Sequence, residues 1–208
     1  MRLGKHSTSG ANRVDYRRSV PLTVPPVVDN VIFGEAQPTI SLDGELALRP
    51  FESGDATVVM RAFATPDIQF WHGFCVDDLD QAQDWISRTR SRWDDAQSAD
   101  WAIVDSEGVG GRCALHIDCR RGTAEIAYWL LPEARGRGVA SRAVNAVTDW
   151  AHTTLGIHRV LLQHSTKNSA SCAVARRVGY IVEGIAREQD IHVDGWHDMH
   201  QHSHLSTD

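Results

Sequence analysis

A short run of arginines and glycines, Arg135-Gly136-Arg137-Gly138, has the residue types and spacing of a phosphate-binding turn. It lies between an apolar stretch that predicts a strand, residues 123–132, and an amphipathic stretch that predicts a helix, residues 138–156. A glycine-rich turn at a helix start exposes backbone N–H groups where a phosphate is favoured. Arginines add charge-assisted hydrogen bonds to phosphate oxygens. The run therefore predicts a site for a phosphorylated ligand.

Three other interpretations of this turn compete with that prediction. A dinucleotide-binding fingerprint needs a third glycine where this chain has Ser141, and a Walker-type loop needs a lysine that the turn lacks. The third interpretation is a helix start that merely happens to contain two glycines. The turn alone does not exclude it, so the neighbouring residues must decide.

Glu125 is a carboxylate in an otherwise apolar predicted strand. Alternation along the strand places it on the same face as Ala127 and Trp129. A carboxylate in such surroundings is costly unless it is paired or functional, so Glu125 is a candidate general base. The alternative is a solvated glutamate at the edge of the strand. Glu183 is a second candidate, and its alternative role is to hold down the helix before it.

The elements that must position these residues follow from hydrophobic periodicity and turn residues. Strands are expected within residues 39–50, at 100–106 and 112–118 around a glycine-rich loop at 107–111, at 123–132, at 158–165 and in a hairpin at 180–205. Helices are expected at 56–64, 78–95, 138–156 and 168–179. This order predicts an α/β (α+β) fold, in which helices flank a mixed, mostly antiparallel sheet.

Composition excludes several classes of protein. The chain has 208 residues and a formal net charge of −6, which argues against a protein that coats nucleic acid. No apolar run approaches the length of a membrane span, and the first residues lack the apolar segment of a secretory signal, so we expect a cytoplasmic protein. Four cysteines without a C-x-x-C pair give no support for a disulfide framework or a structural zinc site.

Residues 1–37 differ from the rest of the chain because they carry several prolines and no helical period. We expect a flexible N-terminal arm, with the folded domain spanning residues 38–208. The apolar patch within the arm offers an alternative, which is docking on the domain or on a second subunit. That patch consists of Val27, Val28, Val31, Ile32 and Phe33.

Several motifs occur together in an order that resembles the GNAT superfamily of N-acetyltransferases, in the branch of the RimJ and RimL ribosomal-protein acetyltransferases. The acyl-CoA signature Q/R-x-x-G-x-G/A is met by Arg135, Gly138 and Ala140. The N-x-x-S pattern of the branch is met by Asn168 and Ser171. The later G-F/Y…E-G pattern is met by Gly179, Tyr180, Glu183 and Gly184. The resemblance covers roughly residues 40 to 205.

The resemblance implies how acetyl-CoA would bind. The turn amides around Gly136, Arg137, Gly138, Val139, Ala140 and Ser141 would hold the pyrophosphate. The strand segment Trp129, Leu130 and Leu131 would splay from its neighbour, typically at a β-bulge, and pair its backbone with pantetheine. Asn168 would steady the pantetheine, and Arg176 would meet the ligand from the following helix.

The same resemblance implies direct transfer of the acetyl group to a primary amine, either a protein N-terminal α-amine or a small-molecule amine. Glu125 would act as general base and Ser171 as general acid toward the CoA thiolate. The alternative for Ser171 is a hydroxyl that caps its helix. Cys172 beside it offers a covalent acyl-enzyme route, which we disfavour because helical geometry turns it about 100° from Ser171.

The amine acceptor is expected near the aromatic segment between the first two predicted helices. Trp71, His72 and Phe74 would line its pocket, although their aromatic rings could also belong to the core. Nearby Asp77, Asp78 and Asp80 would favour a cation, or else serve the start of the following helix.

His200, His202 and His204 alternate and should share one face of the last strand, but we expect a polar face there and no bound metal. The chain is thus expected to be an acetyl-CoA-dependent N-acetyltransferase, monomeric or homodimeric, without nucleic-acid or membrane partners. The rival interpretation is a non-catalytic acyl-CoA-binding module that recruits a protein partner.

Overall fold

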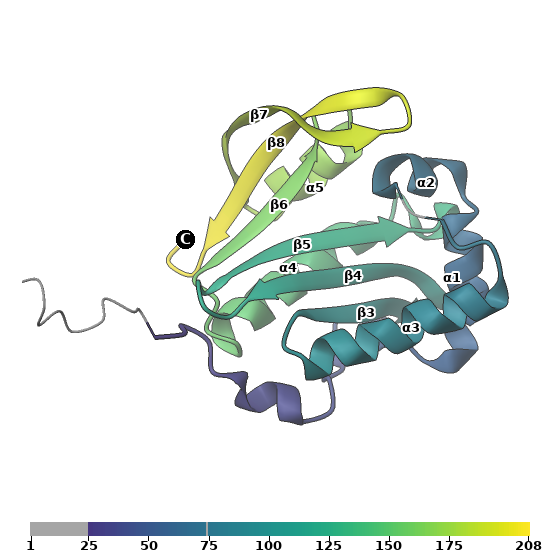
Figure 1. Ribbon diagram of the computed structural model, residues 1–208, viewed down its shortest axis with the longest axis horizontal. Helices are drawn as coiled ribbons and strands as arrows, with labels where there is room; N and C mark the ends of the chain where they lie inside the picture. Colours follow the sequence, from purple (N-terminus) through teal and green to yellow (C-terminus); the bar gives the residue numbers. More distant parts are fainter. Residues whose placement is uncertain (1–24, 74) are drawn as a thin grey trace, which may run out of the picture.

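The computed structural model describes residues 25–73 and 75–208, which form an eight-stranded sheet with helices on both faces (Figure 1). The strands are β1 (Ile40–Ser41), β2 (Ala47–Pro50), β3 (Ser98–Asp105), β4 (Gly108–Asp118), β5 (Thr123–Leu130), β6 (Arg159–Ser165), β7 (Ile181–His192) and β8 (Gly195–Leu205). The helices are α1 (Ala56–Phe63), α2 (Pro66–His72), α3 (Leu79–Asp94), α4 (Val139–Thr153) and α5 (Ser169–Arg177), with short 3-10 turns at Asn30–Gly34, Ser53–Asp55 and Pro132–Ala134. None of the helices in the described part of the chain is long and apolar enough to span a bilayer.

The strand order is β1-β2-β3-β4-β5-β6-β8-β7, and every neighbouring pair is antiparallel except β5 and β6, which are parallel. The predicted mixed, mostly antiparallel sheet is therefore confirmed. The parallel pair arises because α4 connects β5 to β6 as a crossover, whereas β3–β4 and β7–β8 are hairpins.

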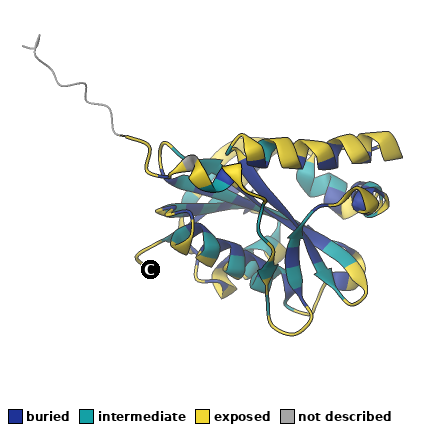
Figure 2. Cartoon of the chain, turned by 90° about the horizontal axis from the view of Figure 1, so that it is seen from below, coloured by how far each residue is buried: buried dark blue, intermediate teal, exposed yellow. Residues whose placement is uncertain are grey.

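Two apolar layers cover the sheet. On one face α1, α2 and α3 pack around Trp85 and Phe63 against Ala102 and Trp129 of the sheet. On the other face α4 and α5 contribute a cluster that includes Val144. Figure 2 shows the buried strands between helices whose outer faces are exposed. The alternation predicted for β5 is confirmed, because Trp129 belongs to the first cluster while Ile126, Tyr128 and Leu130 belong to or pack against the second.

Two details of the elements differ from the sequence-based expectation. The segment between the first two expected helices, to which no helix was assigned, contains α2, a short helix beginning at Pro66. The glycine-rich stretch predicted as a loop belongs mostly to β4, which starts at Gly108. Gly111 fits there because a Cβ would lie 2.6 Å from the Trp129 carbonyl oxygen on the neighbouring strand.

Part of the predicted N-terminal arm packs on the domain, while residues 1–24 lie outside the described residues. Val28 and Phe33 are buried in the core, although Val27 and Val31 of the same apolar patch are exposed. The indole Nε1 of Trp93 donates to the Glu35 carbonyl over 2.8 Å. This part of the arm thus docks on the domain, which is the alternative to a flexible arm.

A buried ion pair joins β3 to β4. Asp100 is fully buried and accepts hydrogen bonds from Arg112 Nε at 2.8 Å and from Ser98 Oγ at 2.7 Å. Burial alone would raise the pKa of Asp100, but the Arg112 charge and these hydrogen bonds outweigh it and lower the pKa. The pair therefore stabilises the fold at neutral pH, and this contribution is lost as the pH falls through the depressed pKa of Asp100.

We predict that Asp100→Asn lowers the free energy of unfolding by about 3–5 kcal/mol at neutral pH, because Arg112 is left as a buried, unpaired charge. The matched control is Asp94→Asn at the exposed end of α3, which should change stability by less than about 0.5 kcal/mol. Urea unfolding followed by circular dichroism measures both. Equal stability of the two variants would show that the ion pair contributes nothing.

Candidate active site

A cleft of about 810 Å³ opens where β5 and β6 separate. The two strands pair over only three residues, ending at Glu125 opposite Leu161, and then diverge, as Figure 1 shows. The expected splay is present, but the expected β-bulge in β5 is not, because β5 stays in unbroken register with β4 from Thr123 to Leu130. The strands separate because β5 stays with β4 while β6 stays with β8.

The glycine turn forms one end of the cleft. Gly136 and Gly138 have φ values of +75° and +72°, which side chains rarely tolerate, and Gly138 is the N-cap residue of α4. Because this N-cap offers no side-chain hydrogen bond, the first N–H groups of α4 stay available for a ligand. Gly136, Gly138, Val139, Ala140 and Ser141 all line the cleft, as the sequence predicts.

The arginines of the turn are already paired with carboxylates. Arg135 pairs with Asp67 and also donates from Nε to the Leu130 carbonyl at 2.9 Å. Arg137 lies 3.2 Å from an Asp105 oxygen, and Arg142 lies 3.0 Å from an Asp43 oxygen. Of these three only Arg135 lines the cleft. A polyphosphate at this turn thus meets the N-terminus of α4 first and competes with carboxylates for the guanidinium groups.

Two other residues predicted to bind the cofactor lie elsewhere. Leu131 is buried, and its N–H donates to the Gly110 carbonyl at 2.9 Å, so the open edge of β5 ends at Leu130. On α5 it is Arg177, not the predicted Arg176, that lines the cleft. Sequence spacing could not separate these neighbours, because the rotation of α5 about its axis depends on its packing.

Asn168 and Ser171 stand together at the start of α5. The Asn168 side chain caps the helix, since its Oδ1 accepts from the Ser171 N–H at 3.0 Å. The interpretation of Ser171 as the capping hydroxyl is therefore wrong. Instead, the Tyr128 hydroxyl donates to Ser171 Oγ over 3.0 Å, which leaves the Ser171 proton free for another acceptor. Both hydroxyls line the cleft, and burial raises the pKa of Tyr128 to about 12.

Glu125 lines the cleft at the point where β5 and β6 part. Burial raises the pKa of its carboxyl, and the negative charge of Asp190 on β7 raises it further. Asp190 also lines the cleft, so two carboxylates face the same space. The other candidate base, Glu183, does not line the cleft and pairs with Arg159 at 2.8 Å. Because Arg159 lies on β6, this ion pair is also not the expected alternative contact with the helix before Glu183.

Trp71 and His72 at the end of α2 line the cleft, and Phe74 lies outside the described residues. Burial and the charge of Arg112 lower the pKa of His72 to about 4, so its imidazole is neutral near pH 7. The predicted cation-attracting aspartates do not line the cleft, and Asp78 is the N-cap of α3, accepting from the Gln81 N–H at 2.8 Å. The helix-start interpretation of these aspartates is therefore favoured.

Several residues that line the cleft were not anticipated as site residues, among them Tyr128, Asp190 and His192. His192 closes one side, where its Nδ1 donates to the Phe70 carbonyl at 3.0 Å. For Tyr128 the sequence did offer a signal, because alternation along the strand placed it on the face opposite Glu125. Asp190 and His192 gave no such signal, because only the fold brings the end of β7 to the mouth of the cleft.

Comparison with known proteins agrees with this geometry. The family model of the acetyltransferase (GNAT) domain matches residues 45–181. The uncharacterized N-acetyltransferase p20 of Bacillus licheniformis is 28% identical over 149 residues, which cover 70% of this chain and 84% of that protein. The ribosomal-protein-serine acetyltransferase of Escherichia coli is 29% identical over 101 residues, covering 49% of this chain and 56% of that protein.

The fold is also that of a solved relative. The structure of Mycobacterium smegmatis RimJ in complex with CoA-disulfide superposes with a TM-score of 0.76 at 19% identity, covering 82% of this chain and 88% of RimJ. With the motifs, the splayed strands and the glycine turn, these matches establish that the chain belongs to the GNAT family, in the RimJ/RimL-like branch, and is an N-acetyltransferase that uses acetyl-CoA.

Proposed function

We propose that the protein transfers the acetyl group of acetyl-CoA to the α-amine of a polypeptide by direct attack, with Glu125 as general base and Ser171 as general acid. The observation that carries this proposal is the position of Glu125, a half-buried carboxylate with a raised pKa where the cleft opens. A purely acyl-CoA-binding module would not need a carboxylate there, so the rival interpretation loses its support.

The cleft suits the two ends of acetyl-CoA. The N-terminus of α4 and the turn before it favour the pyrophosphate. The edge of β5 beyond Glu125 has no pairing with β6 and can hydrogen-bond to the amides of pantetheine as an added strand would. This arrangement brings the thioester to the region between Glu125 and the Tyr128–Ser171 pair.

The proposed reaction moves two protons. Glu125, directly or through one water, takes a proton from the ammonium group of the acceptor, and the neutral amine then attacks the thioester carbonyl. The tetrahedral intermediate collapses by breaking the C–S bond, and the Ser171 hydroxyl protonates the CoA thiolate. The second proton of the attacking nitrogen leaves as the amide forms and returns through one water to the Tyr128–Ser171 pair, which restores both hydroxyls. Because Tyr128 already donates to Ser171 Oγ, its proton can replace the one that Ser171 gives up.

An α-amine fits this base better than a lysine or polyamine amine does. An α-amine has a pKa near 8 and an alkylamine near 10.4, so deprotonation by the same carboxylate costs about 3 kcal/mol less for the α-amine. Asp190 adds a second negative charge that attracts the ammonium form. The E. coli relative named for ribosomal-protein serine acetylation is consistent with such an acceptor, whereas other relatives are named as spermidine acetyltransferases.

Gly138→Asp should abolish acetyl-CoA binding, because it places a negative charge and a side chain where the pyrophosphate is proposed to lie. Gly156→Asp is a matched control, since its φ of +71° is close to the +72° of Gly138 and a Cβ meets nothing within 4 Å at either position. The backbone strain is thus equal, but Gly156 lies beyond the opposite end of α4. Isothermal calorimetry should show binding to Gly156→Asp only; equal affinity of both variants would sink the assignment.

Glu125→Gln should reduce kcat by roughly 100-fold or more at neutral pH and recover part of it at high pH, where the acceptor amine loses its proton unaided. The variant should melt no lower than the wild type, because an ionised carboxylate with a raised pKa costs stability above that pKa. Asp190→Asn should shift the acidic limb of the rate profile to lower pH, since it removes a charge that raises the pKa of Glu125. A wild-type profile for Glu125→Gln would remove Glu125 from the mechanism.

Ser171→Ala should lower kcat strongly and change the KM for the amine much less. Tyr128→Phe should cause a smaller loss of kcat, because Ser171 keeps its own proton. The two losses should not add in the double variant, because both residues serve one proton transfer. Single-turnover kinetics with a peptide acceptor measure these effects. Strict additivity would mean that the two hydroxyls act separately.

The acceptor itself is tested by following free-thiol release with acetyl-CoA and a panel of amines. The panel contains peptides with free N-terminal serine, alanine or methionine, the same peptides with a blocked N-terminus and an internal lysine, and spermidine. Mass spectrometry of the products should locate the acetyl group on the α-amine. Turnover of spermidine alone would support the branch of small-amine acetyltransferases instead.

A further inference from the structure

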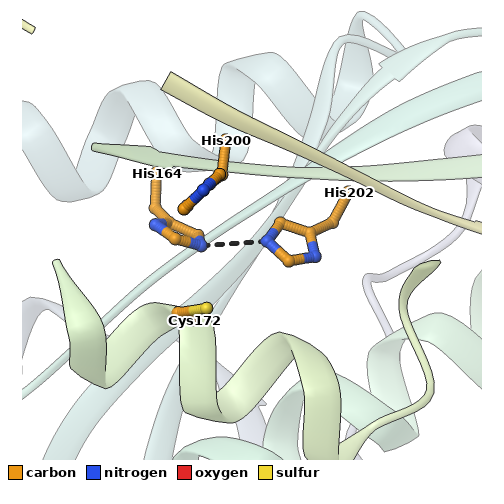
Figure 3. Close-up of side chains that lie close together, drawn as sticks. All are labelled: His164, Cys172, His200 and His202. Carbon is orange, nitrogen blue, oxygen red and sulfur yellow. Dashed lines mark hydrogen bonds between the residues drawn. The ribbon is translucent and has the colours of Figure 1, made fainter. Parts of the chain in front are cut away.

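We propose that this protein holds a zinc ion between the two strands and the helix behind the cleft, bound by His164, Cys172, His200 and His202. We call these four residues the His3Cys cluster. His164 belongs to β6, Cys172 to α5, and His200 and His202 to β8. In Figure 3 the three imidazoles gather above the Cys172 side chain, which lies on the side of the helix that faces them. The proposal is independent of the acetyl-transfer reaction.

The geometry is close to what zinc requires. One ligand atom from each of the four residues can be chosen so that all lie within 4.8 Å of one another. Tetrahedral zinc with bonds of about 2.0–2.3 Å keeps its ligand atoms roughly 3.3–3.7 Å apart. The side chains would therefore close in by roughly 1 Å. Register supports the arrangement, because His164 lies directly opposite His200 in the β6–β8 ladder and diagonally from His202.

The hydrogen bonds of His164 orient it as a metal ligand. Its Nδ1 lies 2.8 Å from the Ser165 carbonyl oxygen, which can only accept, so Nδ1 carries the proton and Nε2 presents a lone pair. A histidine that ligates a metal typically donates its other ring N–H to a carbonyl in this way. The lone pair of His164 Nε2 points to Nε2 of His202 at 3.0 Å.

Without a metal, ring nitrogens of two of these histidines are buried and have no hydrogen-bond partner among the described residues. If His202 Nε2 donates to His164, then Nδ1 of His202 is an acceptor, and it is buried without a hydrogen-bond partner among the described residues. Nδ1 of His200 is likewise buried without a hydrogen-bond partner among the described residues. These buried ring nitrogens have lost their hydration without gaining a hydrogen bond, which is costly. A cation between the lone pairs offsets this desolvation.

The donor set selects the metal. Three imidazoles and one thiolate match zinc, and four protein ligands leave no open position for a substrate. The site is therefore structural, and its position next to the cleft indicates what it would stabilise. Cys172 follows the proposed acid Ser171, and His164 itself lines the cleft. A zinc ion would tie α5 to β6 and β8 and so hold Ser171 against the cleft.

The sequence-based expectation of no metal rested on the spacing of the cysteines and, separately, on the three alternating histidines of the last strand. His200, His202 and His204 alternate on β8 as expected, but His204 is separated from the cluster because its Nδ1 lies 3.1 Å from His152 Nε2 on α4. The missing ligands come from β6 and α5, which are remote in sequence from β8. Only the fold brings His164 and Cys172 to His200 and His202.

Zinc and cobalt binding to untagged, full-length, reduced protein tests the proposal. Elemental analysis should find one zinc per chain, and cobalt added to chelator-treated protein should saturate at one per chain with tetrahedral visible bands and a thiolate charge-transfer band. Cys172→Ser should lose the charge-transfer band. Both Cys172→Ser and His202→Ala should bind more than roughly 100-fold more weakly, exceeding the loss that an outer-shell change causes.

His204→Ala is the matched control, because it removes a histidine from the same strand and face without touching the His3Cys cluster. It should keep wild-type stoichiometry and affinity. Zinc should also raise the melting temperature of the wild type and of His204→Ala but not of Cys172→Ser. The proposal is overturned if the folded wild type binds no stoichiometric metal, in which case the histidines form a metal-free hydrogen-bond network. It is equally overturned if the double variant of Cys172→Ser and His202→Ala binds as tightly as the wild type.

Discussion

The active-site region depends on one interrupted contact, the parallel pairing of β5 with β6 over only three residues. A sheet that paired these strands to their ends would have no cleft and would satisfy the β5 backbone internally. Because the pairing stops at Glu125, the chain carries an unpaired strand edge in the middle of its sheet rather than at its rim. An internal edge of this kind is protected from other chains, yet it remains available to an extended ligand such as pantetheine.

The two ends of the cleft between β5 and β6 differ in their charges. At the turn, Arg135, Arg137 and Arg142 each have a carboxylate partner, so their charges are largely neutralised before any ligand arrives. The backbone N–H groups at the start of α4 have no competing side-chain cap. The proposed recognition of phosphate would thus rest on the helix N-terminus, which requires no ion pair to be broken. At the opposite end, Glu125 and Asp190 concentrate negative charge, in keeping with the net charge of −6 and a cationic acceptor.

The sequence was sufficient wherever the signal is local. The glycine turn, the strand that carries Glu125 and the sheet class all follow from contiguous patterns, and the structure agrees with them. Prediction from the sequence failed where the position of a side chain depends on how two elements pack. The choice between Arg176 and Arg177, the donation from Tyr128 to Ser171 and the arrival of Asp190 at the cleft all depend on side-chain directions set by tertiary contacts. The expected β-bulge was wrong because the splay has another cause, the attachment of each strand to its outer neighbour.

The contacts that attach β5 and β6 to their outer neighbours differ in kind, and the histidines belong to the contacts of β6. β5 is anchored through β4 by an apolar core, whereas the β6–β8 ladder beside the cleft pairs mainly polar residues, such as Gln163 with Gln201 and His164 with His200. Beyond the His3Cys cluster, Ser165 Oγ lies 2.8 Å from His197 Nδ1, and His197 Nε2 lies 2.7 Å from Asp194. Polar contacts are directional, so they fix the angle of β6 more tightly than apolar packing of equal area would. The cleft is therefore bounded on one side by a strand held by apolar packing and on the other by a strand held by hydrogen bonds.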